Sequence, residues 1–211
     1  DGNIPPDFKI GDNRAVEVRR LNQNFFQEAQ VEGLEKLYIP IFDAFHEVLK
    51  SFGKQKSDFS YFVGMFFKRP IDLDIYELKK LIKEKLQSFL NNPDQTFPFS
   101  FAITDDVELI MQKTLSNNKH LLRPKNDMDN DAGGFNISMY IENIRYCIYE
   151  KSEKIKSHLH RYDEWWLYLV DRMFCDLDTY DIKEITKNIQ DIGNFDKVSI
   201  IRNGEISFII D

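Results

Sequence analysis

Residues 165–171 form a nearly continuous apolar run, Trp-Trp-Leu-Tyr-Leu-Val-Asp. Such a run is typical of a central strand that is covered on both faces of its sheet. Apolar residues recur at helical spacing on either side of it, over residues 137–160 and around residues 181–191. These patterns favour an α/β or α+β protein, in which a mixed central β-sheet is flanked by helices.

Period-two alternation predicts a β-hairpin near each end of the chain. Residues 7–21 alternate on both sides of Gly11-Asp12-Asn13, and residues 198–210 alternate on both sides of Asn203-Gly204. The Asn-Gly pair favours a type I′ turn. In the first hairpin, one face is expected to carry Asp7, Lys9, Ala15, Glu17 and Arg19.

The segment between the two hairpins mixes both periodicities. We expect helices over residues 25–52 and 73–91, strands over residues 59–67 and 97–114, and a polar loop over residues 116–134. No linker and no internal repeat is visible in the sequence. We therefore expect a single domain, residues 1–211, with residues 25–135 partly an insertion into its core.

Composition excludes several classes of protein. Hydrophobic residues make up 42% of the chain and aromatic residues 14%, which is too apolar for a disordered protein. Two cysteines argue against a disulfide scaffold or a Cys-rich zinc site, and they fit a cytoplasmic protein. No apolar run approaches about 18 residues, so we expect no membrane span. The chain begins at Asp1 without a methionine, so we expect that residues precede it.

The charge of the chain is unevenly distributed. The total of −7 argues against a dedicated nucleic-acid binder, which usually carries excess base. However, residues 109–126 include Lys113, Lys119, Arg123 and Lys125 and no acid, and residues 145–161 carry more bases than acids. Such a basic middle could face a phosphate backbone. Solvated helix and loop faces would explain the same pattern equally well.

Asp7 and Glu17 are the two carboxylates whose spacing best suits a shared metal ion. On adjacent paired strands they would share one face, and oxygen ligands of this kind suit Mg²⁺ or Mn²⁺. An ion there can activate a water and offset the charge of a phosphate under attack, while a neighbouring cation stabilises the developing charge. The alternative is that both acids lie on the solvated face of an ordinary hairpin.

Residues 6–23, PDFKIGDNRAVEVRRLNQ, resemble the PD-(D/E)XK motif of restriction-endonuclease-like nucleases. Pro6, Asp7 and Glu17 match the pattern of Pro-Asp, a hairpin, and then acid-any-Lys on the next strand. The resemblance implies a restriction-endonuclease-like core, which the predicted helix over residues 137–160 and the strand over residues 165–171 would complete. It also implies metal-dependent hydrolysis of phosphodiester bonds in DNA, with RNA as the second choice.

The resemblance also implies a role for each residue of the site. Asp7 and Glu17 would bind Mg²⁺ (or Mn²⁺). Arg19 stands where the family has lysine, and it would steady the scissile phosphate, helped by Lys9, although an arginine can hardly act as a base. Gln23 would position the substrate or a ligand water. The alternative function is a catalytically inactive binding or interaction module with the same fold, and the edge of the C-terminal hairpin leaves a homodimer open.

Overall fold

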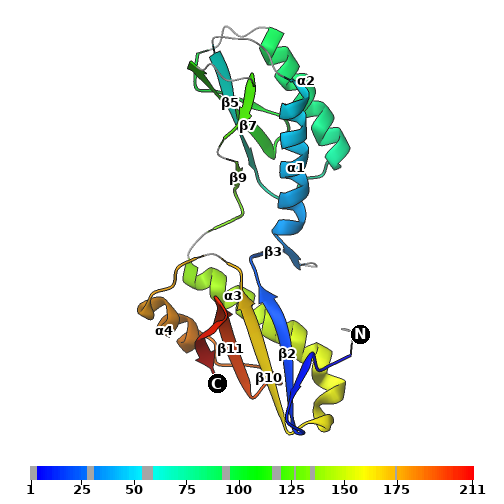
Figure 1. Ribbon diagram of the computed structural model, residues 1–211, viewed down its shortest axis with the longest axis vertical. Coiled ribbons are helices and arrows are strands. Elements are labelled where there is room, and N and C mark those ends of the chain that lie inside the picture. Colours follow the sequence, from blue (N-terminus) through cyan, green and yellow to red (C-terminus); the bar gives the residue numbers. More distant parts are fainter. Residues whose placement is uncertain are drawn as a thin grey trace. The chain divides into compact units, whose positions relative to one another are not determined.

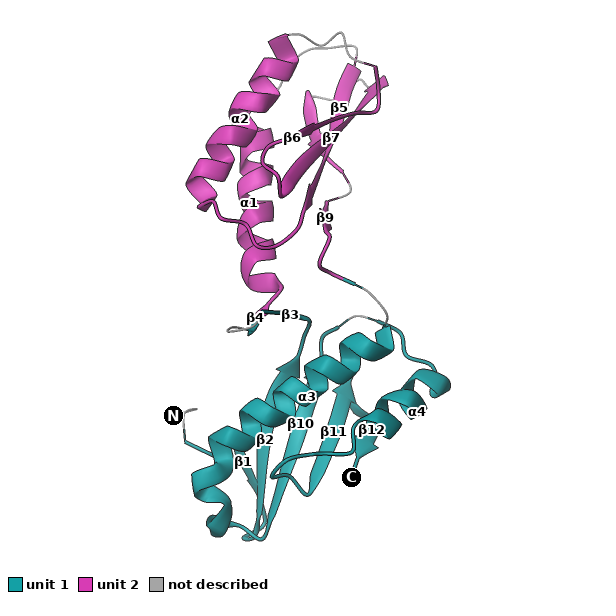
Figure 2. Cartoon of the chain, turned by 180° about the vertical axis from the view of Figure 1, so that it is seen from behind, with its two compact units in different colours: residues 1–31, 133–211 teal, residues 32–132 magenta. Residues whose placement is uncertain are grey.

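The computed structural model divides the chain into two compact units, which Figure 2 shows in different colours. Unit 1 comprises residues 1–31 and 133–211, and unit 2 comprises residues 32–132. The structure describes residues 4–27, 31–53, 59–91, 96–115, 120–125, 127–133, 136–173 and 175–211. The expected single domain, residues 1–211, differs from this division, because residues 32–132 enclose a hydrophobic core of their own. Two helices and a sheet within that segment each bury an apolar face against the others.

Unit 1 is built on a five-stranded mixed sheet (Figure 1). Its strands, in spatial order, are β1 (Phe8–Ile10), β2 (Arg14–Leu21), β10 (Glu164–Asp171), β11 (Lys197–Arg202) and β12 (Glu205–Ile210). Strands β2, β10 and β11 are parallel, whereas β1 and β12 run antiparallel to their neighbours at the two edges. The predicted N-terminal hairpin and the central position of β10 are thus confirmed.

Two helices lie on one face of this sheet, α3 (Asn136–Ile155) and α4 (Thr179–Asn188), as Figure 2 shows. A 3-10 helix, Lys156–Arg161, continues α3, so the predicted helix over residues 137–160 is confirmed with a tighter last part. The apolar stripe of α3 packs into one core with Ala15 of β2 and Leu167 of β10. This packing turns the face of β2 that carries Ala15 toward α3.

The other face of β10 differs from the prediction. Trp165 and Leu167 are buried, but the alternate residues Trp166 and Tyr168 are only half-buried. Among the described residues both helices of unit 1 cover the opposite face, so the prediction of a strand covered on both faces was wrong. Side chains pack on Trp166 instead, and the guanidinium carbon of Arg14 lies 4.1 Å from its ring centroid.

The C-terminal hairpin and its turn are confirmed, with a shift in register between Ile200 and Ile201. Strands β11 and β12 pair in antiparallel fashion around Asn203 and Gly204. These two residues have φ values of 54° and 85°, which is the positive pair that a type I′ turn requires.

Unit 2 is a five-stranded mixed sheet with two helices on one face (Figure 1). The strands, in spatial order, are β6 (Phe99–Ala102), β7 (Val107–Leu115), β5 (Phe59–Phe67) and β8 (Leu122–Pro124), and β9 (Met128–Asp129) also pairs with β5. The helices are α1 (Glu35–Ser51) and α2 (Ile75–Asn91). Alternate residues of β5, beginning at Tyr61, are buried in the core that α1 and α2 share with the sheet.

Two predictions for the middle of the chain were wrong in part. Residues 25–52 were expected to be one helix, but β3 (Asn24–Phe26) and β4 (Val31–Gly33) precede α1. The predicted loop over residues 116–134 contains β8 and β9. Strands of two or three residues are too short to show a period-two pattern, so only their backbone pairing reveals them.

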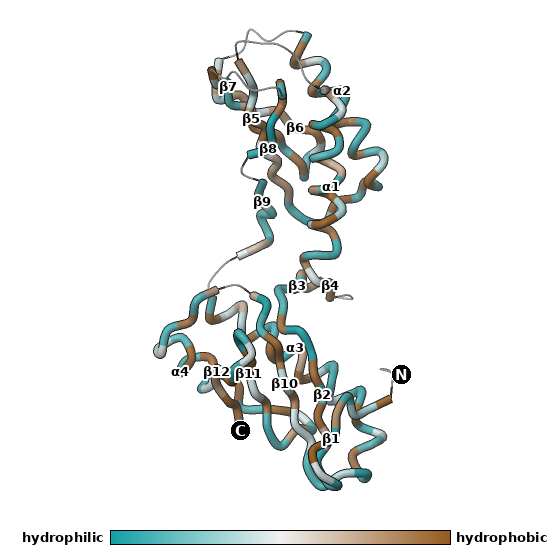
Figure 3. Tube along the Cα trace, viewed as in Figure 1, coloured by the Kyte–Doolittle hydropathy of each residue, from teal (hydrophilic) through white to brown (hydrophobic). Residues whose placement is uncertain are grey.

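The described residues thus form an α/β protein with mixed sheets and four α-helices. Each helix in Figure 3 carries both hydrophilic and hydrophobic residues, as expected for burial on one side only. No helix in the described part of the chain is long and apolar enough to cross a membrane.

Candidate functional site

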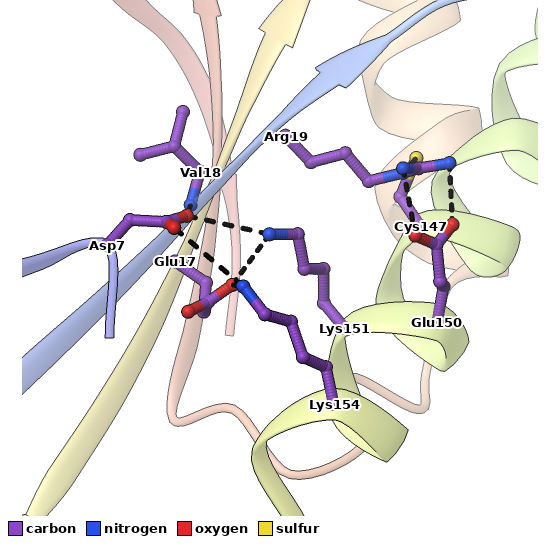
Figure 4. Close-up of polar contacts among 8 residues, drawn as sticks. All are labelled: Asp7, Glu17, Val18, Arg19, Cys147, Glu150, Lys151 and Lys154. Atoms are coloured by element: carbon purple, nitrogen blue, oxygen red, sulfur yellow. Dashed lines mark hydrogen bonds and ion pairs between the residues drawn. The ribbon is translucent and has the colours of Figure 1, made fainter. Parts of the chain in front are cut away.

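The β1–β2 hairpin brings Asp7 next to Glu17, as Figure 4 shows. The strands pair with Phe8 opposite Val16 and Lys9 opposite Ala15, and Asp7 immediately precedes β1. The Oδ2 atom of Asp7 accepts a hydrogen bond of 2.8 Å from the backbone N–H of Val18. The two carboxylates singled out in the sequence therefore lie side by side at one end of the hairpin.

Glu17 is fully buried between β2 and α3, with an exposed fraction of 0%. Its Oε2 atom accepts hydrogen bonds from two lysines of α3, 2.6 Å from Lys151 Nζ and 2.9 Å from Lys154 Nζ. Residues three apart on a helix share a face, so both ammonium groups reach the same carboxylate.

The same two lysines also approach Asp7. Lys151 Nζ lies 3.5 Å from Asp7 Oδ2, and Lys154 Nζ lies 3.8 Å from Asp7 Oδ1. Two carboxylates and two ammonium groups thus form one cluster whose formal charges balance, which we call the β2–α3 cluster. Burying charges in this way is tolerated only when each has close partners of opposite sign.

The surroundings alter two pKa values in the β2–α3 cluster. Burial by itself would raise the pKa of Asp7, but the Val18 N–H and the charges of Lys151 and Lys154 outweigh it and hold that pKa below its usual value. Burial would likewise lower the pKa of Lys154, but the hydrogen bond and charge of Glu17 raise it overall. Asp7 is therefore held ionised and Lys154 is held protonated near neutral pH.

One oxygen of the cluster has no partner in the described part of the chain. Glu17 Oε1 is buried and accepts no hydrogen bond there, although Oε2 of the same carboxylate accepts two. A buried polar atom without a partner costs about 1–3 kcal/mol, so native proteins rarely leave one unused. Its capacity to accept a hydrogen bond is therefore unused among the described residues.

Arg19 lies apart from the two carboxylates. Its guanidinium group forms a two-point contact with Glu150, at 3.0 Å to Oε1 and 2.6 Å to Oε2, and its Nε donates to Cys147 Sγ at 3.2 Å. Residues two apart on a strand lie about 7 Å apart, so Arg19 meets an earlier turn of α3 than Glu17 does. Burial raises the pKa of the Cys147 thiol, although Arg19 opposes this shift.

Lys9 and Gln23 make contacts elsewhere. Lys9 Nζ lies 5.4 Å from the ring centroid of Tyr162, and Gln23 Oε1 accepts a hydrogen bond of 3.3 Å from the backbone N–H of Gly133. Among the described contacts of these two residues, none joins them to the carboxylates of the β2–α3 cluster. The structure thus brings together two of the five residues predicted for the site.

Sequence reasoning missed Lys151 and Lys154 as site residues. Two signals pointed toward them, namely the excess of bases over acids in residues 145–161 and the helix predicted over residues 137–160. The sequence does not show which residues of that helix pack against β2, so the two lysines could not be assigned to the site.

The site as described consists of two carboxylates, two ammonium groups and the backbone N–H of Val18. Within the described ranges, no three side chains of His, Cys, Asp or Glu lie close enough together to hold a metal ion. Comparison with known proteins found no family model, no curated protein and no solved structure that matches the chain.

Proposed function

We propose that the chain is a metal-dependent nuclease of the restriction-endonuclease-like class, which hydrolyses phosphodiester bonds of DNA or, as the second choice, of RNA. The observation that carries the proposal is the β2–α3 cluster. It places Asp7 and fully buried Glu17 side by side at one end of a hairpin, with two ammonium groups at 2.6 Å and 2.9 Å from Glu17 Oε2. A buried acid on a helix-covered strand face needs a reason, and a phosphate-cleaving site supplies one.

The connectivity of unit 1 supports this proposal. Asp7 precedes β1, Glu17 lies on β2, and after the residues of unit 2 the chain returns through α3 to β10, which is parallel to β2. This is the order of acid, hairpin, acid, helix and buried strand that the PD-(D/E)XK resemblance implies.

Asp7 and Glu17 would hold the metal ion, Mg²⁺ or Mn²⁺. The donors fit this choice because they are carboxylate oxygens, and Glu17 Oε1 is buried without a partner among the described residues. Mg²⁺ commonly keeps several waters, so two protein carboxylates are an adequate set. When bound, such an ion lowers the pKa of a coordinated water and offsets negative charge on the phosphate.

Lys151 and Lys154 would supply the positive charge that the sequence assigned to Arg19 and Lys9. Their ammonium groups already lie at the carboxylates, whereas the guanidinium of Arg19 is engaged with Glu150. In this proposal the lysines bind phosphate oxygens and stabilise the charge that develops during hydrolysis. Arg19 fastens β2 to α3, and a role for Gln23 in positioning the substrate stays a prediction.

One observation favours the alternative, a catalytically inactive module that binds a partner. Lys151 contacts both carboxylates, and the charges of the cluster balance without any ion. A closed ion-pair network of this kind would hold α3 against the sheet and need no further ligand.

Cleavage of plasmid DNA and of single-stranded DNA and RNA in Mn²⁺ tests the proposal. We expect the wild-type chain to cleave, EDTA to stop cleavage, and Glu17→Gln to lower it to background. The matched control is Glu205→Gln, an exposed glutamate of the same sheet, which should cleave like the wild type. Equal cleavage by the wild type and Glu17→Gln would contradict the proposal, and a wild type that neither cleaves nor binds Mn²⁺ in calorimetry would support the inactive module.

Two further variants in the same assay distinguish the role of Lys151 in cleavage from that of Arg19. Lys151→Ala should lower the cleavage rate about 100-fold, because it removes a charge that stabilises the transition state. Arg19→Gln should retain more activity than Lys151→Ala, since its partner is Glu150. The reverse order would return the catalytic role to Arg19. Circular dichroism of each variant checks that the fold is intact.

A further inference from the structure

The sheet of unit 2 has one face that no helix covers among the described residues. Figures 1 and 2 both show α1 and α2 on the same side of this sheet. The cross-strand register places Phe62 opposite Gln112, Gly64 opposite Ile110, and Phe66 opposite Glu108. On β5 these positions alternate with the core residues Tyr61, Val63, Met65 and Phe67, so they lie on the opposite face, although Gly64 itself is buried. We call this surface the β5 face.

The β5 face is aromatic at two points and hollow between them. Phe62 and Phe66 are half-buried, and Gly64 between them has no side chain. A shallow cavity of about 100 Å³ is lined by Phe62, Gly64, Phe66, Ile110, Gln112 and Lys125. Phe62 and Phe66 are four positions apart on the strand, so their backbone positions lie about 13 Å apart.

Two cations gather at the Phe62 end of this face. The guanidinium carbon of Arg123 lies 4.7 Å from the Phe62 ring centroid, and Lys125 Nζ lies 5.1 Å from it. Lys125 also donates a hydrogen bond of 3.0 Å to Gln112 Oε1. Glu108, an acid on this face, pairs with Phe66 at the other end. Both bases belong to the stretch over residues 109–126 that has no acid, of which Lys119 lies outside the described residues.

This combination fits a single-stranded nucleic acid better than other ligands. Unpaired bases stack on the accessible parts of aromatic rings such as the half-buried Phe62 and Phe66, and the phosphates between the bases pair with neighbouring lysines and arginines. Bases within a duplex are already stacked on one another and cannot reach a flat sheet face. A purely apolar partner would leave Arg123 and Lys125 without a counter-charge in the interface.

We propose that the β5 face binds single-stranded nucleic acid, with bases stacked on Phe62 and Phe66 and the phosphates held by Arg123 and Lys125. The inference deepens the proposed function, because it adds that the substrate contains a single-stranded segment. Only this link between binding and cleavage rests on the proposed function. The binding itself is independent of Asp7 and Glu17.

Fluorescence anisotropy with labelled oligo(dT), oligo(U) and a duplex of equal length tests this inference. The full chain is used in EDTA, so that binding is measured without cleavage. We expect single strands to bind more tightly than the duplex, and the ratio of oligo(dT) to oligo(U) affinity tells which nucleic acid is preferred. Phe62→Ala and Phe66→Ala should each raise the Kd for single strands about 5- to 100-fold. Lys125→Glu should raise the Kd and make it less dependent on salt.

Matched controls lie on the helix side of the same unit. Tyr76→Ala removes an exposed ring of α2, and Lys83→Glu reverses an exposed charge of α2, so both should bind like the wild type. Lys125 is exposed, so its substitution keeps the test valid if a phenylalanine variant fails to fold. Wild-type affinity in Phe66→Ala and Lys125→Glu would overturn the inference, as would the absence of single-strand binding by the wild type. Pull-down of a protein partner that these substitutions abolish, without any oligonucleotide binding, would also overturn it.

The outcome is distinguishable from that of the proposed function. If the chain binds single strands in EDTA, binds them more weakly in Phe66→Ala and Lys125→Glu, and never cleaves them, the nuclease proposal fails and the β5 face stands. If the chain cleaves plasmid DNA and the phenylalanine variants bind and cleave like the wild type, the β5 face fails and the nuclease proposal stands.

Discussion

On the helix-covered face of β5 in unit 2, Tyr61, Val63, Met65 and Phe67 are all apolar and at most 1% exposed. On the helix-covered face of β2 in unit 1, Glu17 occupies the equivalent middle position at 0% exposure. Both strands lie beneath helices in sheets of similar size. One uses this face to bury apolar surface, whereas the other uses it to bury a charge.

The difference concerns what each face contributes to stability. Each large apolar side chain buried on β5 contributes about 1.5–3 kcal/mol to the free energy of unfolding. Glu17 must be desolvated instead, and the ion pairs with Lys151 and Lys154 largely offset that cost rather than exceed it. The comparison suggests that β5 serves folding, while β2 forgoes apolar burial to hold carboxylates at a fixed place.

The largest effect is expected in the core of unit 2. Met65→Ala should lower the free energy of unfolding by about 2–5 kcal/mol, because the side chain is fully buried and leaves a cavity. Urea denaturation followed by far-UV circular dichroism measures it, while the fluorescence of Trp165 and Trp166 reports on unit 1 alone. Leu115→Ala, at an 89% exposed position of the same sheet, should change stability by less than about 0.5 kcal/mol. If Met65→Ala changed the free energy of unfolding only slightly, apolar burial on β5 would not stabilise the fold more than charge burial on β2 does.

A smaller effect, of opposite sign, is expected in the β2–α3 cluster. Replacing Glu17 and Lys151 together by Leu and Met should leave stability unchanged or raise it by up to about 4 kcal/mol, because the buried charges are removed as a pair. The double variant should also lose the proposed nuclease activity. Tryptophan fluorescence in urea measures the stability of unit 1. A loss as large as that of Met65→Ala would mean that the cluster serves folding after all.

The smallest effect is expected in the pH dependence of the two units. The pKa of Asp7 is lower in the folded chain than its usual 3.8, so its contribution to stability is present above that value and is lost as pH falls through the folded pKa. Burial raises the pKa of Asp127 in unit 2 in spite of its hydrogen bond with His46, so its contribution is present at low pH and is lost as pH rises through the folded pKa.

NMR titration of the two carboxyl groups checks these directions against the ordinary aspartate pKa of 3.8. Asp7 should titrate below that pKa, and Asp127 should titrate above it. Stability curves of Asp7→Asn and Asp127→Asn should then differ from the wild type with opposite slopes in the acid range. Titration of Asp7 above the ordinary pKa of 3.8 would show that the lysines of α3 do not surround it as described.

Much of the local structure could be predicted because it follows from neighbouring residues. The alternation around Gly11 placed Asp7 and Glu17 on one face of a hairpin, and the Asn203-Gly204 pair predicted the C-terminal turn. The short strands β3, β8 and β9 could not be predicted, since two or three residues show no periodicity.

The sequence by itself determined the approximate positions of the α-helices and the long strands, and it determined that two carboxylates share one end of a hairpin. Only the tertiary structure decided that residues 32–132 form a separate core, that Arg19 pairs with Glu150, and that Lys151 and Lys154 reach Glu17. The physical reason is the range of the interactions. Periodicity and turn chemistry act between residues close in the chain, whereas Glu17 and Lys151 are 134 positions apart and meet only through the packing of α3 on β2.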